Sequence, residues 1–594
     1  LTEAEHAQIE PLHPSHAAYV FLGDKVDLRG HSHPPLNAWI LAGLLAWLGD
    51  VREVPFHLAY AIFSIVAAMA MWPLARRFSK RPFLATLLFC AVPAFVINGN
   101  SLESDLPFLA FWMSAVAFFV YAVDRDSRWA LAGSFLSAGL AALAAYQAVL
   151  LTPILAAYLM GKRRNWIPGW AAALAAPAVL GTWQIWERAT SGALPASILA
   201  GYLTSYNFEA LTNKARAVAA LTVHLGWIVC PLIVLASAAA AVRDRRARWR
   251  LLPAVLAAAA GIFYDPNPLF WLSLGCGVWL LTWSFGKGFP GHWLLIFFAG
   301  AMAIFFTGSA RYLLPLAAPA AILMADAVGP GVAAAGIALQ LGLWGSLSIV
   351  NYQHWDAYRR FAATLKNDAA QHRVWINSDL GLRFYLESLG GLPLTKGQRI
   401  QPGDIVATSK LSNPIRVGSP LAPLAQIEVR PSIPLNLISL SGRSAYSDGS
   451  HGLLPFEIST APIDRVRAEI AIEPQFSYVD PHDARAASQI VRGIFPDGWM
   501  TREAAVVLKA PEGAAALQVS FYVPQSAPAR RVQMSVDGRI VAEKALPGPG
   551  AYTLTAPAAS GARSITVTLS VDRTFSAPPD IRKLGVILTG IGFK

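Results

Sequence analysis

Charge and cysteine are both scarce in this 594-residue chain, and each shortage excludes a class of protein. Only 14% of the residues are charged and 55% are hydrophobic, which is too apolar for an ordinary soluble protein and typical of several membrane spans. The three cysteines, Cys90, Cys230 and Cys276, all lie inside apolar runs. We expect them to be small buried hydrophobic residues, so no disulfide framework and no cysteine-ligated metal is predicted.

Motifs for zinc and nucleotide chemistry are also lacking. The sequence has no CxxC pattern, no HExxH pattern and no Walker-type phosphate loop. The formal net charge of +12 could indicate nucleic acid, but Lys and Arg occur in short clusters between apolar runs rather than along a soluble domain. We therefore predict no nucleic-acid partner and expect membrane lipids around the chain.

Long apolar segments fill most of the first 350 residues. They cover 36–48, 55–75, 83–98, 105–123, 129–145, 147–160, 166–186, 217–242, 251–264, 268–285, 291–307, 311–327 and 329–350. The first segment is short and bounded by Pro34-Pro35 and Gly49-Asp50, so we predict a juxtamembrane or re-entrant helix there. The other twelve are predicted spans. We expect a further span upstream of Leu1, where the chain opens without a signal-peptide pattern.

Basic clusters determine the predicted topology. They are Arg76-Arg77 with Lys80-Arg81, then Lys162-Arg163-Arg164, then Arg243 through Arg250. The positive-inside rule places all of them in the cytoplasm. The loops at 1–54, 99–104, 187–215, 265–267 and 308–310 then share the outer face with everything after residue 350. The predicted location is a bacterial inner (plasma) membrane, crossed many times, with a periplasmic or extracellular C-terminal domain.

Four regions follow from this pattern. The predicted fold class is a polytopic α-helical membrane protein of about 12–13 spans with a C-terminal α/β unit and β-sandwich. Residues 1–54 form an outer-face loop with its juxtamembrane helix, and 55–350 form the transmembrane domain. Residues 351–430 mix short strands and helices, as in a small periplasmic α/β unit. Residues 431–594 alternate apolar and polar side chains between Pro and Gly turns, which predicts a periplasmic β-sandwich.

Five short motifs follow one another along the chain, and their order points to a known family. They are His33-Pro34-Pro35-Leu36, Ser104-Asp105-Leu106-Pro107, Arg311-Tyr312-Leu313-Leu314-Pro315, Arg383-Phe384-Tyr385-Leu386 and Gln401-Pro402-Gly403-Asp404. Over about 1–410 the chain resembles GT-C glycosyltransferases of the family 39 type. That group includes the polyprenyl-phosphate-mannose protein mannosyltransferases and the aminoarabinose transferase of lipid A.

The resemblance implies an inverting membrane glycosyltransferase. Its donor would be a polyprenyl-phosphate-linked sugar, and its acceptor a lipid, a glycan or a protein at the periplasmic face. Such enzymes carry an Asp-Glu pair after their first span, and the Asp of that pair is catalytic. Glu3 and Glu5 stand there in this chain without an Asp. Either of them replaces the catalytic Asp, or an Asp upstream of Leu1 supplies it.

The implied reaction needs a carboxylate that takes the acceptor's proton and a cation that stabilises the departing phosphate. Asp105 is the further carboxylate candidate, although it also fits a helix N-cap, and Glu103 precedes it in the same outer loop. His33 is a candidate for binding the donor phosphate. A divalent metal is one candidate cofactor, and no other cofactor is predicted.

Arg311 is the most informative single residue. A cation is disfavoured both on the outer face and at a helix N-terminus, and Arg311 occupies both places. The two penalties favour a phosphate contact over simple snorkelling of the side chain. Its neighbour Tyr312 is expected to pack at the membrane interface.

Two alternatives of other classes stay open. A transporter or flippase of lipid-linked sugars would show charges deep within its spans or paired broken helices. A catalytically inactive glycan-binding relative would explain the missing Asp.

Overall fold

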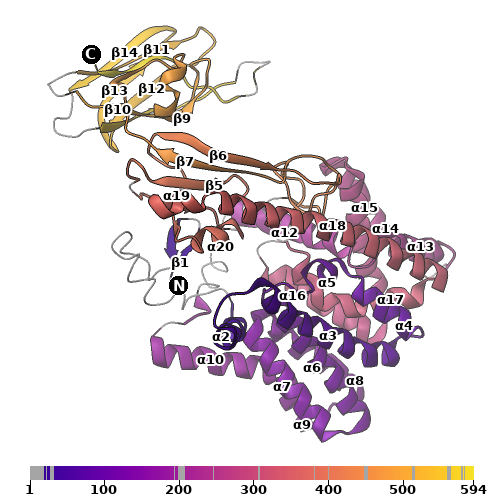
Figure 1. The fold of residues 1–594 in the computed structure, drawn as a ribbon. Coiled ribbons are helices and arrows are strands. Elements are labelled where there is room, and N and C mark those ends of the chain that lie inside the picture. Colours follow the sequence, from indigo (N-terminus) through magenta and orange to yellow (C-terminus); the bar gives the residue numbers. More distant parts are fainter. Residues whose placement is uncertain are drawn as a thin grey trace. The chain divides into compact units, whose positions relative to one another are not determined.

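The structure is a computed structural model that divides into two compact units. It describes residues 19–21, 23–26, 33–192, 194–197, 208–244, 247–305, 308–379, 381–398, 400–446, 452–511, 516–557, 564–576, 580 and 582–593. One unit, called here the helical unit, comprises residues 27–354 and 430–463. The other, called the sheet unit, comprises residues 1–26, 355–429 and 464–594 (Figure 1).

Helices make up nearly all of the secondary structure in the helical unit. In the first half they are α2 (Leu36–Leu48), α3 (Glu53–Phe78), α4 (Pro82–Cys90), α5 (Pro93–Asn98), α6 (Asp105–Arg125), α7 (Arg128–Ala144), η2 (Tyr146–Leu150), α8 (Leu151–Lys162), α9 (Ile167–Ala173) and α10 (Ala175–Ser191). In the second half they are α12 (Phe208–Leu225), α13 (Pro231–Val242), η3 (Arg248–Leu251), α14 (Leu252–Tyr264), α15 (Pro268–Ser284), α16 (Gly288–Ile304), η4 (Arg311–Leu316), α17 (Ala317–Ala327) and α18 (Pro330–Thr364).

The helices are more broken than the apolar segments predicted. Among the described residues, α3, α6 and α18 are long and apolar enough to cross a bilayer. The segment predicted at 83–98 divides before Pro93, and that at 217–242 divides before Pro231. Proline cannot donate the helical hydrogen bond and is favoured at a first helical position, so each opens a new helix. The predicted count of twelve spans therefore stays a prediction.

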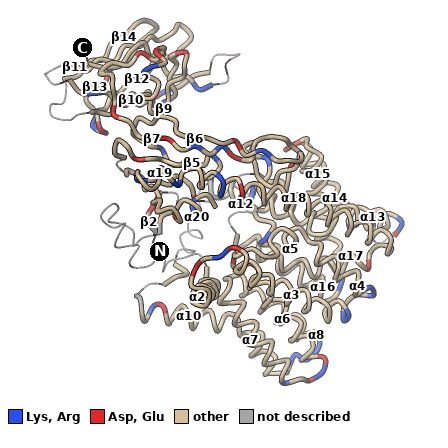
Figure 2. Tube along the Cα trace, viewed as in Figure 1, with Lys and Arg blue, Asp and Glu red and all other residues tan. Residues whose placement is uncertain are grey.

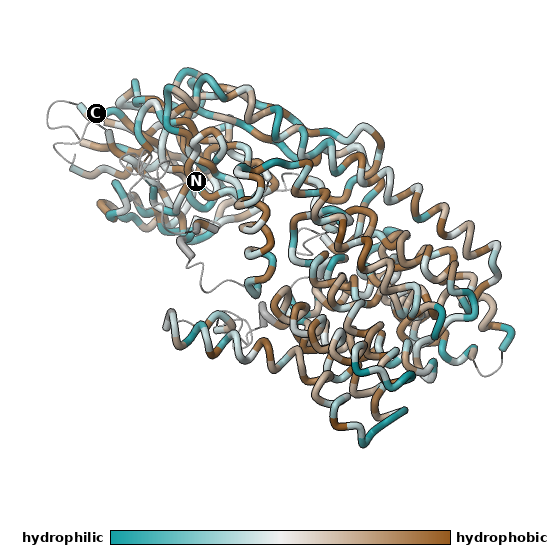
Figure 3. Tube along the Cα trace, turned by 60° about the horizontal axis from the view of Figure 1, so that its bottom comes forward, coloured by the Kyte–Doolittle hydropathy of each residue, from teal (hydrophilic) through white to brown (hydrophobic). Residues whose placement is uncertain are grey.

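The outer surface of α3 is suited to lipid. Its exposed large side chains are Leu58, Ile62, Ile65, Met69 and Trp72, spaced three or four residues apart. This spacing places them on one face of the helix. An apolar stripe left uncovered along a long helix is the expected lipid-facing surface of a membrane protein. Figure 3 shows the apolar colouring of this unit's helices.

The two ends of the helical unit differ in charge. At one end, Arg77 Nε donates to Asp124 Oδ2 of α6 (2.5 Å), and Arg81 Nη1 donates to the carbonyl of Ala325 in α17 (3.0 Å). The C-terminal ends of α6 and α17 thus meet the basic turn between α3 and α4, and Figure 2 marks further Lys and Arg beside α8 and α13. The N-terminal ends of α6 and η4 carry Asp105 and Arg311.

The sheet unit begins with a small α/β layer. The strands are β1 (Tyr19–Phe21), β2 (Asp24–Val26), β3 (Val374–Asn377), β4 (Leu392–Pro393), β5 (Ile405–Ser409), β6 (Leu421–Val429) and β7 (Asp464–Ala471), with helices α19 (Lys366–Gln371) and α20 (Gly381–Glu387). The main sheet has the order β4-β3-β5-β7-β6, in which β4, β3 and β5 run parallel. The β1–β2 hairpin is tied to this layer, because Lys396 N donates to the carbonyl of Gly23 (2.8 Å).

A β-sandwich forms the rest of the sheet unit, as its alternating sequence indicated. One sheet has the order β13 (Arg539–Leu546), β12 (Arg530–Val536), β15 (Ser564–Val571), β10 (Met500–Lys509) and β9 (Ile490–Ile494). The other has the order β14 (Gly550–Pro557), β11 (Ala516–Val523), β16 (Ile587–Phe593) and β8 (Tyr478–Val479), and the short helix η5 (Ala484–Gln489) precedes β9. The neighbouring strands of both sheets pair antiparallel, and the sandwich core contains no residue of the α/β layer.

Two predicted boundaries differ in the structure. The boundary at 350 falls inside α18, because the helix continues without a break to Thr364. The sandwich predicted from 431 begins near residue 478, since β7 pairs with β5 and β6 of the α/β layer. The alternation of β7 is the same as that of a sandwich strand, so its pattern alone did not assign its sheet.

Residues 430–463 form an insertion between β6 and β7 that belongs to the helical unit. Leu437, Tyr446 and Phe456 join the main helical core. The insertion braces itself: Asn436 and Glu457 exchange backbone hydrogen bonds, and the buried Glu457 carboxylate accepts from Ser441 Oγ (2.8 Å). It is an ordered part of the helical unit rather than the first part of a sandwich.

Candidate active site

The loop at 99–104 is held in place by hydrogen bonds from α2 and α3. Asn37 Nδ2 of α2 donates to the carbonyl of Leu102 (3.1 Å), and Tyr60 Oη of α3 donates to Asn37 Oδ1 (2.6 Å). Ser64 Oγ of α3 donates to the carbonyl of Gly99 (2.6 Å). These bonds fix the loop that leads into α6 and therefore position its acidic residues.

Arg311 lies between the two carboxylates of this loop. Its Nη1 forms an ion pair with Asp105 Oδ2 (3.3 Å) and a shorter one with Glu103. Glu103 lies in the loop before α6, Asp105 opens α6 and Arg311 opens η4, and more than 200 positions separate Arg311 from its partners. Asp105 and Arg311, which the sequence predicted to share one outer-face site, are in direct contact, and their roles in that site stay predictions.

The two carboxylates differ in exposure. The Asp105 side chain is 10% exposed and that of Glu103 is 48% exposed. Asp105 occupies the first turn of α6, where the helix dipole favours a negative charge. The cap position belongs to Ser104, whose side chain makes no capping bond. The Asp105 side chain therefore pairs with Arg311, and Asp105 does not occupy the N-cap position that its sequence also allowed.

Two buried polar atoms at this place have no partner among the described residues. They are Nε of Arg311 and Oη of Tyr446, which lies in the 430–463 insertion and is 3% exposed. The backbone of Tyr446 is fixed beside Arg311, because its carbonyl accepts from Ala310 N (3.1 Å) and Ser309 Oγ (3.4 Å). The sequence did not point to Tyr446, since nothing in the pattern of 430–463 distinguished it from sandwich strands.

The remaining predicted site residues stand as follows. Glu3 and Glu5 lie outside the described residues. His33 is exposed just before α2, and its contact with a donor phosphate stays a prediction. Tyr312 is partly buried and stacks on Phe305, with ring centroids 4.4 Å apart.

A metal site formed by protein ligands alone is not apparent in the described part of the chain, which contains no group of three or more His, Cys, Asp or Glu arranged to hold an ion. Glu103 and Asp105 offer carboxylate oxygens from a single loop, the ligand type that Mg²⁺ prefers, but they are already paired with Arg311. A metal would need further ligands from the substrate phosphate.

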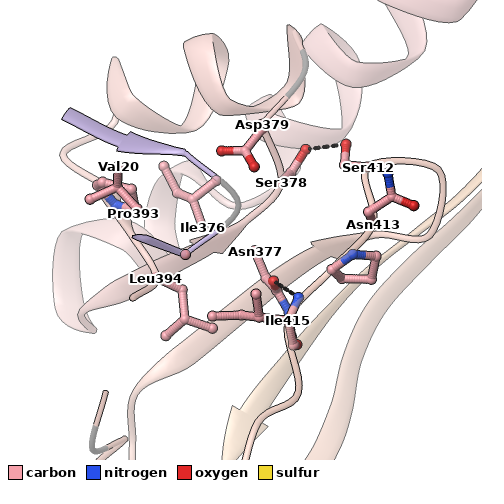
Figure 4. A pocket seen from close by; sticks show the side chains of 12 residues that line it. Val20, Ile376, Asn377, Ser378, Asp379, Pro393, Leu394, Ser412, Asn413 and Ile415 are labelled. Atoms are coloured by element: carbon pink, nitrogen blue, oxygen red, sulfur yellow. Dashed lines mark hydrogen bonds between the residues drawn. The ribbon is translucent and has the colours of Figure 1, made fainter. Parts of the chain in front are cut away.

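A polar hollow lies in the sheet unit, at the carboxyl ends of β3 and β5 (Figure 4). Its polar groups satisfy one another. Asn377 exchanges hydrogen bonds with the backbone of Ile415, and Ser378 Oγ lies 2.9 Å from Ser412 Oγ. Asp379 pairs with Arg383 (3.4 Å). These bonds join the loops after the two strands, which is a structural role.

A family model described as dolichyl-phosphate-mannose-protein mannosyltransferase matches residues 32–186. The matched segment contains His33, Glu103 and Asp105 but not Arg311. It confirms the resemblance to GT-C glycosyltransferases over this part of the chain. No curated protein sequence matches the chain.

Solved structures give a weaker likeness. Two structures of arabinofuranosyltransferase AftD from Mycobacteria, one of them a mutant, are each 12% identical, with TM-scores of 0.28 and 0.25. Arabinosyltransferase EmbB from Mycobacterium smegmatis is 11% identical, with a TM-score of 0.23. The alignments cover 92%, 93% and 89% of this chain but 57%, 55% and 58% of theirs. The chain thus spans little more than half the length of these proteins.

Proposed function

We propose that this chain is an inverting membrane glycosyltransferase that uses a polyprenyl-phosphate-linked sugar. The observation that carries the proposal is the partly buried Arg311 between Glu103 and Asp105, at the helix ends opposite the basic turns. Transfer from a lipid phosphate needs a cation for the leaving group and a carboxylate for the acceptor. Both lie here in one cluster.

The reaction is a single displacement. The acceptor oxygen attacks the anomeric carbon on the side opposite the phosphate, and the bond between that carbon and the phosphate oxygen breaks. The acceptor's proton passes to a carboxylate, for which Asp105 is the candidate within the described residues. The electron pair leaves with the polyprenyl phosphate, whose negative charge Arg311 stabilises. One displacement inverts the anomeric configuration.

Glu103 gives the site a way to admit the donor. Arg311 is paired with two carboxylates in this structure. A phosphate can bind the guanidinium only if one of these pairs opens. Because Glu103 is half exposed, it can turn towards water at little cost, whereas the buried Asp105 cannot. The donor phosphate then replaces Glu103 on Arg311, and Asp105 stays in place.

The helix breaks argue against the transporter alternative. The residues at the breaks, 91–92 and 226–230, include no Asp, Glu, Lys or Arg that could bind or relay an ion. The inactive-relative alternative predicts donor binding without turnover, and the assay below separates it from the enzyme.

Release of polyprenyl phosphate tests the function whichever acceptor the enzyme uses. The protein in lipid nanodiscs is given polyprenyl-phosphate-linked mannose or arabinose together with a membrane extract as acceptor. We expect Arg311→Ala to slow release by about 10²- to 10³-fold, as loss of one transition-state donor does, and Arg311→Lys to retain part of the rate. Arg582→Ala removes the same charge from the sandwich and should leave the rate unchanged. Equal rates for all variants would contradict the proposal.

The proposed orientation has its own test. Asn100 lies in the loop beside the site and Lys80 in the basic turn, and both are exposed. Cysteine placed at 100 should react with a membrane-impermeant thiol reagent in intact cells, and cysteine at 80 only after lysis. The reverse pattern would place the site in the cytoplasm.

A further inference from the structure

We infer that Tyr446 is a further phosphate-binding residue of this site, supplied by the 430–463 insertion. The inference rests on the proposed function, because it assigns the buried hydroxyl to the donor's phosphate. Tyr446 is 3% exposed, and its hydroxyl has no partner among the described residues. A buried polar group without a partner is destabilising, and a ligand that accepts from this hydroxyl would remove that cost.

The position of Tyr446 is determined by both its backbone and its ring. Its carbonyl accepts hydrogen bonds from Ser309 and Ala310, the two residues directly before Arg311. Its ring packs against that of Trp344 in α18, with centroids 6.2 Å apart. The backbone of Tyr446 is thus held beside residues 309–310, and its ring is held by Trp344.

The free atoms at this place are suited to an anion. Arg311 Nε can only donate a hydrogen bond, and it is buried without an acceptor among the described residues. Burial raises the pKa of the Tyr446 phenol well above its usual range, and the Arg311 charge only partly offsets this. The phenol therefore stays protonated and can donate. Both atoms are donors without an acceptor among the described residues, and such donors suit the oxygens of a phosphate.

The surrounding insertion fixes the Tyr446 hydroxyl in place before the ligand binds. Glu457 is 4% exposed and accepts hydrogen bonds from Ser439 and Ser441, while its backbone pairs with that of Asn436. A buried carboxylate satisfied in this way braces the segment that carries Tyr446. A donor fixed before the ligand arrives loses little freedom on binding.

The test uses undecaprenyl monophosphate as the probe and the full chain in nanodiscs. Tyr446→Phe removes the hydroxyl and keeps the ring beside Trp344. We expect it to weaken binding of the probe by about ten- to a hundredfold, as loss of one hydrogen bond to a charged group does. Because this hydroxyl has no partner in the described structure, the melting temperature should not fall.

Tyr158→Phe is the matched control at the other end of the helical unit. The Tyr158 hydroxyl donates to Asp124 Oδ1 (2.7 Å), so its loss should lower the melting temperature while probe binding stays within about twofold of the wild type. Undecaprenol, which lacks the phosphate, should bind equally to wild type and Tyr446→Phe.

The outcomes separate this inference from the proposed function. Equal binding of undecaprenyl monophosphate by wild type and Tyr446→Phe overturns the inference, as does a wild type that does not bind it. A parallel loss of undecaprenol binding also overturns it, because the effect would then act on the prenyl chain. If binding depends on Tyr446 but no sugar is ever transferred, the inference stands and the enzymatic proposal fails. If transfer depends on Arg311 but not on Tyr446, the reverse holds.

Discussion

Two of the chain's clusters, each an arginine between two carboxylates, differ in how fully the arginine is used. On the sandwich, Arg582 donates from Nε to Asp580 (3.0 Å), from Nη1 to Asp497 (3.3 Å) and from Nη2 to both (2.7 Å). In the helical unit, Arg311 pairs through Nη1 and leaves Nε buried without an acceptor among the described residues.

Exposure separates the clusters further. Asp105 is 10% exposed, whereas Asp497 is 47% exposed and Asp580 28%. All three guanidinium nitrogens of Arg582 donate to carboxylates of its own loops, so Arg582 joins those loops and has a structural role. A partly buried arginine with an unused donor has capacity left for a ligand. Charge composition alone does not distinguish these two clusters, whereas the unused donor of Arg311 does.

Truncation of the chain between the two clusters should have the largest effect. A chain that ends after Glu473 loses the sandwich with Arg582 but keeps the α/β core, the insertion and Arg311, because the sandwich core lies entirely beyond that point. We expect it to release polyprenyl phosphate at close to the full rate. A chain that ends after Val429 loses β7 and Tyr446 and should be inactive.

Melting curves and release assays on both truncated chains check this expectation. A well-folded chain ending after Glu473 that is inactive would place a necessary group in the sandwich. An active chain ending after Val429 would show that neither the insertion nor β7 is needed.

The Asp105→Asn variant should give the next largest effect. It removes the candidate base but keeps the shape, so we expect turnover to fall by about 10²- to 10⁴-fold. The melting temperature should change little, since Glu103 still pairs with Arg311. Asp497→Asn is the matched control on the sandwich and should retain full turnover. If Asp105→Asn keeps its rate, the base lies elsewhere, with Glu3 and Glu5 as the remaining candidates of this chain.

The sequence pointed to the charged residues of the proposed site but not to the residues around them. Asp105 and Arg311 were found because each places a charge beside an apolar segment, where it is costly. Tyr446 was not found, because its role depends on an unsatisfied hydroxyl, which only packing reveals. The strands within 351–430 and 431–594 followed from the sequence pattern, but the sheet to which β7 belongs depends on long-range pairing that local alternation does not encode.

Glu103→Gln should have the opposite effect and strengthen binding of the donor. This half-exposed carboxylate competes with the phosphate for Arg311, so its neutralisation should tighten donor binding by about two- to fivefold, the range for an exposed ion pair. Titration of the variant with undecaprenyl monophosphate measures the change. Glu503→Gln, which removes a similarly exposed partner of Arg492 on the sandwich, should leave binding unaltered. Weaker binding by Glu103→Gln would mean that Glu103 positions Arg311 instead of competing for it.

The smallest change is expected in the stability that the Arg582 cluster gives to the sandwich. Hydrogen bonds from Arg582 lower the pKa of both Asp497 and Asp580 below the usual aspartate value of about 3.9. Groups with a lowered folded pKa add stability that is fully present above the unfolded value and is lost as the pH falls through the folded one. The melting temperature of a 474–594 fragment should therefore exceed that of its Asp497→Asn variant between pH 5 and pH 7. The difference should be lost as the pH falls through the lowered pKa of Asp497, and it should shrink in about 1 M salt, where charges are screened within about 3 Å. A difference that persists unchanged at low pH would assign the stabilisation to packing of Arg582 on Phe495, whose ring centroid lies 4.5 Å from the guanidinium carbon, and not to its charge.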